Sequence, residues 1–114
     1  MAACGTWNLA SIRLFELLKN SKSVLVTGIG GGYDFMSGLP LAYSLLNGGK
    51  EVTLGNLSFS HIAFHKNNDH LTDHCIIVTS DSTSQQNYFP EKYYAEFHKE
   101  KFGSTLPIYA FARN

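Results

Sequence analysis

One stretch sets the architecture expected for this chain: Ser23-Val-Leu-Val-Thr-Gly-Ile-Gly-Gly-Gly-Tyr-Asp34. Its apolar run, Val24 to Val26, is too short for a helix and rich in β-branched residues, so it predicts a buried strand. The glycines that follow are Gly28, Gly30, Gly31 and Gly32. A strand, a glycine turn and a helix start together form a site where backbone N–H groups and a helix dipole bind an anionic group.

The rest of the chain alternates between helical and strand patterns. Helices are expected over residues 8–20 with Asn8 as N-cap, from Met36 or Ser37 to the Asn47-Gly48-Gly49 cap, and from Pro90 to Gly103. Strands are expected at residues 23–27, 51–54, 75–79 and 108–111, and residues 60–74 are expected to be a short helix or a loop. This alternation predicts a Rossmann-like, three-layer α/β/α domain over residues 1–114, with a mostly parallel sheet of about four strands.

The strand at residues 24–27 is expected to be central, because a continuous apolar run is typical of a strand covered on both faces. A Rossmann order (3-2-1-4) would place a ligand between strands one and four, whereas a flavodoxin order (2-1-3-4) would bring Asp81 beside the glycine loop. The last expected strand is followed by three residues only. We therefore expect an incomplete domain with part of one sheet face bare, which favours self-association.

Composition narrows the classes of function. The 114 residues carry nine basic and nine acidic side chains without a long run of either sign, so neither a nucleic-acid nor a membrane-surface footprint is expected. Cys4 and Cys75 form no C-x-x-C pair, which favours a reducing compartment. Arg13 and Glu16 interrupt the apolar start, so no signal peptide or membrane span is expected. These features predict a cytoplasmic protein.

The glycine motif departs from the best-known nucleotide signatures. A dinucleotide fingerprint needs glycine where this chain has Tyr33, and an acid after the second strand where it has Leu54 to Ser58. Gly28, Gly30 and Gly32 also resemble the first motif of S-adenosylmethionine-dependent methyltransferases, against which the missing acid counts as well. There is no G-K-[ST] motif, so a P-loop is excluded. Four glycines in five positions exceed what a turn needs, which favours contact with a ligand.

Two longer blocks carry a family resemblance. Residues 28–41, from Gly28 through Leu39-Pro-Leu41, and residues 49–59, from Gly49 to Phe59, resemble the DUF1152 family of uncharacterised proteins. Residues 79–82, 88–91 and 108–111 fit the same family. The resemblance covers nearly all of the chain from Ser23 onward and matches the N-terminal part of longer proteins. It implies a fold and a pocket at the glycine loop but no reaction, because the family has no established activity.

The residues expected to bind a ligand lie at the carboxyl ends of the first two strands. They are Gly28, Gly30, Gly31, Gly32, Asp34, Asn56 and Ser58. Asp34 and Asp81 are the candidates for a catalytic role. Asp34 either caps a helix or holds Mg²⁺ that bridges to a phosphate, or else contacts a ligand hydroxyl or amine. Asp81 either joins the pocket or forms an N-cap or Asx-turn.

A histidine-rich segment is interpreted as a polar loop rather than a metal site. His61 and His65, and His70 and His74, have the i,i+4 spacing of metal ligands, with Asp69 or Asp73 nearby. Asn67 and Asn68 break the helical pattern that such a pair needs. No metal site is therefore predicted here.

Three functions remain open on the sequence. The first is a Rossmann-like domain whose glycine loop binds a phosphate-bearing or nucleotide-like small molecule, with Mg²⁺ as the cofactor that such a ligand would bring. The second is a catalytically inactive partial domain that acts through association. The third is a methyltransferase-like domain.

Overall fold

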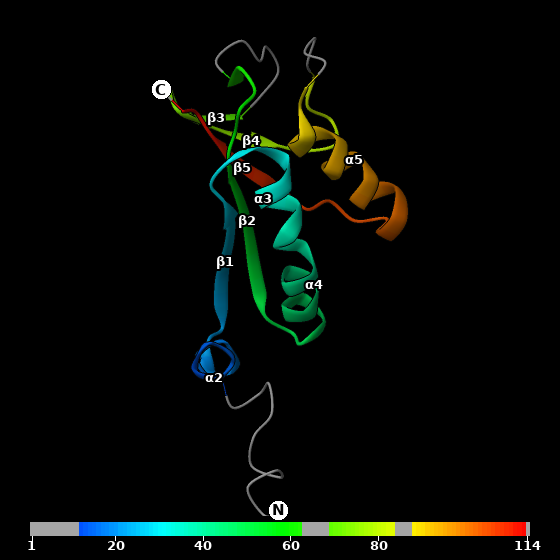
Figure 1. The fold of residues 1–114 in the computed structure, drawn as a ribbon. Helices are drawn as coiled ribbons and strands as arrows, with labels where there is room; N and C mark the ends of the chain where they lie inside the picture. Colours follow the sequence, from blue (N-terminus) through cyan, green and yellow to red (C-terminus); the bar gives the residue numbers. More distant parts are fainter. Residues whose placement is uncertain (1–11, 63–68, 84–87, 114) are drawn as a thin grey trace, which may run out of the picture.

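The computed structural model describes residues 12–62, 69–83 and 88–113, which form one mixed α/β fold (Figure 1). In chain order the elements are α2 (Arg13–Asn20), β1 (Ser23–Gly28), α3 (Gly31–Ser37), α4 (Leu39–Asn47), β2 (Glu51–Leu57), β3 (Asp69–Thr72), β4 (Cys75–Val78), α5 (Pro90–Phe102) and β5 (Ile108–Phe111). The expected strands and the expected end of each helix are close to these bounds, but Asn8 lies outside the described residues.

The strands form one five-stranded sheet in the order β1-β2-β5-β4-β3. β1, β2 and β5 run parallel, β4 is antiparallel to β5, and β3 is antiparallel to β4. The sheet is therefore mostly but not wholly parallel. β3 was not expected, because the polar sequence of residues 69–72 has no strand pattern and gains its structure only by pairing with the apolar β4.

The prediction that the strand at residues 24–27 is central is wrong. β1 pairs with β2 along its whole length and lies at the edge of the sheet, beyond which no described strand pairs with it. Neither the Rossmann nor the flavodoxin order is present, because β5 and then β4 add to the far side of β2. Only one side of the apolar run of β1 faces the helices. Val24 and Val26 on this side are partly buried, while Leu25, between them, is 61% exposed.

The helices that pack on the sheet all cover the same face (Figure 1). Alternate residues of β2, β4 and β5 point toward these helices and form one buried cluster with them. Its members are Phe35, Leu39, Ala42, Leu54, Ile62, Ile76, Val78, Phe89, Tyr94, Ala95, Ile108 and Ala110. The opposite face carries Leu25, Thr53 and Phe111, all of them exposed. In the described residues the sheet thus has one helical layer, not the two that a three-layer domain requires.

The glycine run starts a helix earlier than the sequence indicated. The predicted start at Met36 or Ser37 is wrong, because α3 begins at Gly31 and a break at Gly38 separates it from α4. A Cβ atom at Gly38 would lie 2.8 Å from Val26 Cγ1, so only glycine allows this close approach of helix and strand. The end at Asn47 is confirmed, and Gly49 has the left-handed φ of 81° typical of a helix terminus.

Helix α2 stands apart from the core. It has no buried residue and lies beyond the start of β1 (Figure 1). Its C-terminal end is held by Lys50, whose ammonium donates to the carbonyl oxygens of Lys19 and Ser21. No helix of the described residues is both long and apolar enough to cross a membrane.

Candidate functional site

The glycine loop leaves the carboxyl end of β1 beside the carboxyl end of β2, with Gly28 paired to Asn56. A Cβ atom at Gly28 would lie 2.5 Å from Asn56 Oδ1 and 2.6 Å from the backbone nitrogen of Phe35. Any side chain at residue 28 would therefore separate the loop, the start of α3 and Asn56. Gly28 is needed for close packing, and it keeps Asn56 directly under the loop.

Aromatic side chains cover the loop. The Gly32 N–H donates to the Tyr88 hydroxyl over 3.1 Å, so this N–H is not free for an anion. Gly31 has a φ of 72°, and a Cβ atom there would lie 3.2 Å from the Phe59 ring. The Arg113 guanidinium lies over the Phe59 ring, 4.9 Å from its centre. The loop is thus flanked by aromatic rings with a cation at their edge.

A buried polar pair lies beneath the loop. Asn56 and Glu91 are both 0% exposed, and Asn56 Nδ2 donates to Glu91 Oε1 over 2.9 Å and to the Gly31 carbonyl over 3.2 Å. β2 positions Asn56, whereas Glu91 is the second residue of α5, after the Pro90 that opens the helix. The pair therefore joins the loop, the sheet and α5 at one point.

Two oxygen atoms of this pair have no partner among the described residues: Asn56 Oδ1 and Glu91 Oε2. A buried polar atom without a hydrogen bond costs about 1–3 kcal/mol, and a buried charge without a partner costs more. The ion pairs of the described residues involve other acids, namely Glu16, Glu96 and Asp81. An amide oxygen and a carboxyl oxygen are the ligands that a hard cation prefers, and they also accept hydrogen bonds from hydroxyl or amino groups.

Ser58 shapes the chain beside this pair. It is buried, its N–H donates to the Phe111 carbonyl over 2.8 Å, and its Oγ accepts from the Ser60 N–H over 3.1 Å. Ser60 Oγ in turn donates to the Tyr88 carbonyl over 2.7 Å. The Ser58 hydroxyl therefore holds the segment that carries Phe59, and Ser60 ties that segment to Tyr88.

The structure separates the two aspartates expected at the site. Asp34 is exposed in the first turn of α3, with its Oδ2 atom 3.1 Å from where a Cβ of Gly30 would lie, so its carboxylate turns back toward the loop. Asp81 follows β4, which runs antiparallel, and its carboxylate is 3.7 Å from Lys99 Nζ near the far end of α5. The antiparallel direction of β4 takes Asp81 away from the glycine loop.

The histidine segment forms no metal site in the part of the chain that the structure describes. No group of three or more His, Cys, Asp or Glu side chains there is placed to hold an ion. His70 lies in β3 and His74 lies in the turn between β3 and β4, while His65 is outside the described residues.

Sequence reasoning missed the residues that complete the site: Phe59, Tyr88, Glu91 and Arg113. Glu91 follows Pro90 at a helix start, where an acid is ordinary, so its pattern gives no sign of burial. Aromatic residues are more often core than site, which hid Phe59 and Tyr88.

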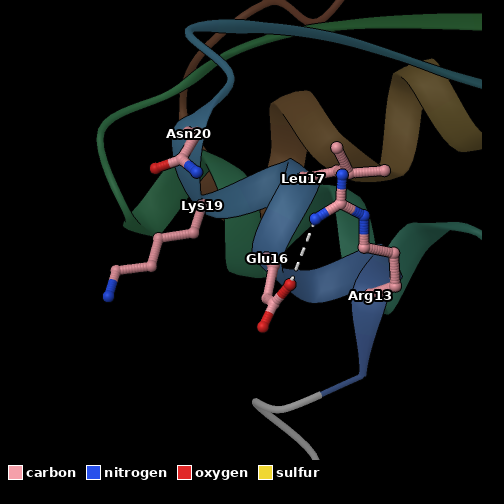
Figure 2. Close-up of a pocket in the computed structure, with 5 residues that line it drawn as sticks. All are labelled: Arg13, Glu16, Leu17, Lys19 and Asn20. Atoms are coloured by element: carbon pink, nitrogen blue, oxygen red, sulfur yellow. Dashed lines mark hydrogen bonds and ion pairs between the residues drawn. The ribbon is translucent and has the colours of Figure 1, made fainter.

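Surface hollows among the described residues also lie away from the loop. The first is lined by side chains of α2 alone, where Arg13 and Glu16 form an exposed ion pair at 3.5 Å (Figure 2). The second is apolar and lies between α4 and α5, next to Met36, Pro40 and Phe97. The third lies on the other side of Tyr43, next to His98 and Ser104. The residues that line the α2 hollow all belong to a helix without a buried residue, so the core does not fix their positions.

Comparison with protein families, with curated proteins and with solved structures finds no match to this chain.

Proposed function

We propose that this protein binds a phosphate-bearing or nucleotide-like small molecule together with Mg²⁺ at the glycine loop. The observation that supports the proposal is the buried Asn56–Glu91 pair, whose Oδ1 and Oε2 atoms have no partner in the described residues. A divalent cation takes both kinds of oxygen as ligands, and it also neutralises the carboxylate.

Charge explains why the cation and the phosphate belong together. Glu91 and Asp34 beside the loop repel a bare phosphate, whereas Mg²⁺ reverses the local field. Arg113, at the edge of the aromatic cover, adds a second positive charge. A base or other planar group of the ligand would stack on Phe59 or Tyr88, which are both exposed beside the glycines.

A thermal-shift experiment tests the proposal with ATP, ADP, NAD and S-adenosylmethionine, each in MgCl₂ and in EDTA. A bound ligand at a hundred times its Kd should add roughly 2.7 kcal/mol to the free energy of unfolding. We expect a shift with at least one of the phosphate compounds that disappears in EDTA. No shift with any of them would refute the proposal, and a shift with S-adenosylmethionine alone would favour the methyltransferase-like alternative.

Substitutions of Glu91 and Asp34 test which carboxylate holds the cation. Glu91→Gln keeps the size of the side chain but removes its charge, and we expect it to lose the magnesium-dependent shift. Glu96→Gln on the same helix, where Glu96 pairs with Lys92 outside the site, is the matched control and should behave as the parent protein. Asp34→Asn should retain the magnesium dependence, since Asp34 is exposed and only the buried pair lacks partners.

The Rossmann-like architecture and membership of the DUF1152 family are part of the same proposal. The parallel strands β5, β2 and β1 lie in the order third-second-first, which is one half of the doubly wound arrangement. In that arrangement the next strand pairs with β1 and the second helical layer covers the other face. A glycine loop after the first strand is where such folds bind phosphates.

The exposed face favours a second function, association with another copy of the chain. Leu25, Thr53 and Phe111 are exposed on it, and the edge of β1 beside it lacks a pairing strand in the described residues. An apolar edge strand without charges or proline is a template for pairing. Size-exclusion chromatography with light scattering tests this function, and a monomer at all concentrations would refute it.

A further inference from the structure

A second polar cluster joins α4, α5 and the residues that follow α5. His98 Nδ1 lies 2.8 Å from the Tyr43 hydroxyl, and His98 Nε2 lies 3.2 Å from Ser104 Oγ. The Tyr43 hydroxyl is also hydrogen-bonded to that of Tyr94. The imidazole therefore connects a serine hydroxyl on one side to a pair of phenols on the other.

The fold holds this cluster in place. Gly103, with a φ of 69°, ends α5 and turns the chain so that Ser104 returns to His98, which lies six residues earlier. His98 is 5% exposed and is stacked on Tyr43, with ring centres 5.8 Å apart and planes 9° apart, and it also packs on Phe102. Ser104, by contrast, is exposed. The base is rigid and buried while the hydroxyl is accessible.

Tyr43, His98 and Ser104 line one surface hollow. Its volume is about 490 Å³, and its walls also contain Leu46, Phe102 and Leu106. Acyl transfer uses a nucleophile, a base and a group that orients the base. Here all three face a hollow with apolar walls.

The protonation of the cluster suits this chemistry. Burial lowers the pKa of His98, so the imidazole is neutral at pH 7. Burial, with a smaller contribution from the hydrogen bond to Tyr43, raises the pKa of Tyr94, so its phenol keeps its proton. With Nδ1–H donating to the Tyr43 oxygen, Nε2 is left to accept the proton of Ser104.

We propose that Ser104, His98 and Tyr43 form a hydrolytic site for activated esters of small carboxylic acids, separate from the glycine loop. Ser104 is the nucleophile and His98 the general base, and Tyr43 is a positioning residue that fixes the orientation and tautomer of His98. The distances from His98 to both partners and the shared hollow carry the proposal.

The reaction balances without a further reactant. Ser104 Oγ forms a bond to the ester carbonyl carbon while its proton moves to His98 Nε2, and the bond to the leaving alcohol breaks as His98 returns the proton to it. Water then attacks the acyl-serine, its proton passes through His98 to Ser104 Oγ, and the acid is released. The sum is ester plus water giving acid plus alcohol.

The test uses the full chain with p-nitrophenyl acetate, followed by mass spectrometry of the acylated peptide. We expect a burst of p-nitrophenol and an acetyl group on the peptide that contains Ser104. Ser104→Ala should abolish both, and His98→Gln should lower the acylation rate by about 10²-fold or more. Ser37→Ala, which alters an exposed serine on α3, is the matched control and should leave the rate unchanged.

Tyr43→Phe tests the positioning role. It keeps the ring that stacks on His98 but removes the oxygen that accepts from Nδ1–H, a bond that is strongest when the imidazole is charged. We expect a slower reaction whose rise with pH moves to lower pH, a change that loss of packing alone would not produce. Acetylation on lysine or tyrosine instead of Ser104, or an unchanged rate in a folded Ser104→Ala, would overturn the proposal. If Ser104→Ala does not fold, Ser104→Cys must retain acylation, now as a thioester.

Discussion

The two faces of the sheet differ more than their sequences do. On one face, β1, β2, β4 and β5 contribute Val26, Leu54, Val78 and Ile108, which α3, α4 and α5 cover. On the other, Leu25 and Phe111 are exposed although they are as apolar as the residues opposite. An apolar strand sequence thus indicates which contacts its residues are suited to make, whereas in the described part of the chain the helices cover one side of the sheet only.

Shortening one leucine on each face should give the largest difference between the two faces. Leu54 is 0% exposed and Leu25 is 61% exposed, on neighbouring strands. We expect Leu54→Ala to lower the free energy of unfolding by about 2–5 kcal/mol, because it leaves a cavity in the core. Leu25→Ala should change the same quantity by no more than about 0.5 kcal/mol. Urea denaturation measures both, and equal losses would show that the second face is covered in solution.

Glycines on the covered side give the next largest effect. Gly38→Ala would bring a methyl group 2.8 Å from Val26 Cγ1, and we expect a loss of about 1–3 kcal/mol from this overpacking. Gly48→Ala is the control, since its φ of −78° suits alanine and its nearest neighbours are 3.4 Å away. The control should gain roughly 0.4–1 kcal/mol by restricting the unfolded chain. If both variants were equally stable, Gly38 would not lie as close to Val26 as it does in the structure, and the prediction would be wrong.

A charge on the exposed face tests whether this face takes part in association, because it leaves the core unchanged. Leu25→Lys should change the free energy of unfolding little, but it should reduce the concentration-dependent rise in mass expected for the parent chain, because an edge lysine opposes strand pairing. Thr53→Lys on the neighbouring β2 places the same charge on the same exposed face, away from the unpaired edge. Light scattering across a hundredfold range of concentration provides the measurement. An unchanged mass in Leu25→Lys would place the association, if any, elsewhere on the molecule.

Local pattern predicted the elements well and their arrangement poorly. The glycine caps gave the C-terminal ends of α4 and α5 correctly, and Pro90 gave the start of α5, since these effects act within a few residues. The edge position of β1 could not be predicted, because strand order depends on contacts between distant segments. β3 was missed for the same reason, as only its pairing with β4 makes the polar residues 69–72 a strand.

The candidate site followed the same division. Adjacent parallel strands put their carboxyl ends together, which places Gly28 beside Asn56, two of the residues expected to bind a ligand. Glu91 arrives from a helix 35 residues beyond Asn56, and nothing local distinguishes it from an exposed first-turn acid. Asp81 was expected beyond a parallel strand, but β4 is antiparallel and carries it to Lys99 instead.

The smallest effect concerns pH and compares the helical layer with the β3–β4 hairpin. Burial lowers the pKa of His98, so the unfolded chain binds a proton at this residue more readily than the folded one. Its contribution to stability is therefore complete above the ordinary histidine pKa of about 6.5 and declines as the pH falls below that value. The groups that face the imidazole are the phenols of Tyr43 and Tyr94 and the hydroxyl of Ser104, so we assign the decline to His98 itself. We expect the free energy of unfolding, measured in urea between pH 5 and 8, to fall less steeply toward acid in His98→Gln than in the parent chain. His74→Gln, at an exposed position of the hairpin, is the control and should retain the parent slope. Identical slopes in all three proteins would mean that the pKa of His98 is the same in the folded and the unfolded chain, and the prediction would be wrong.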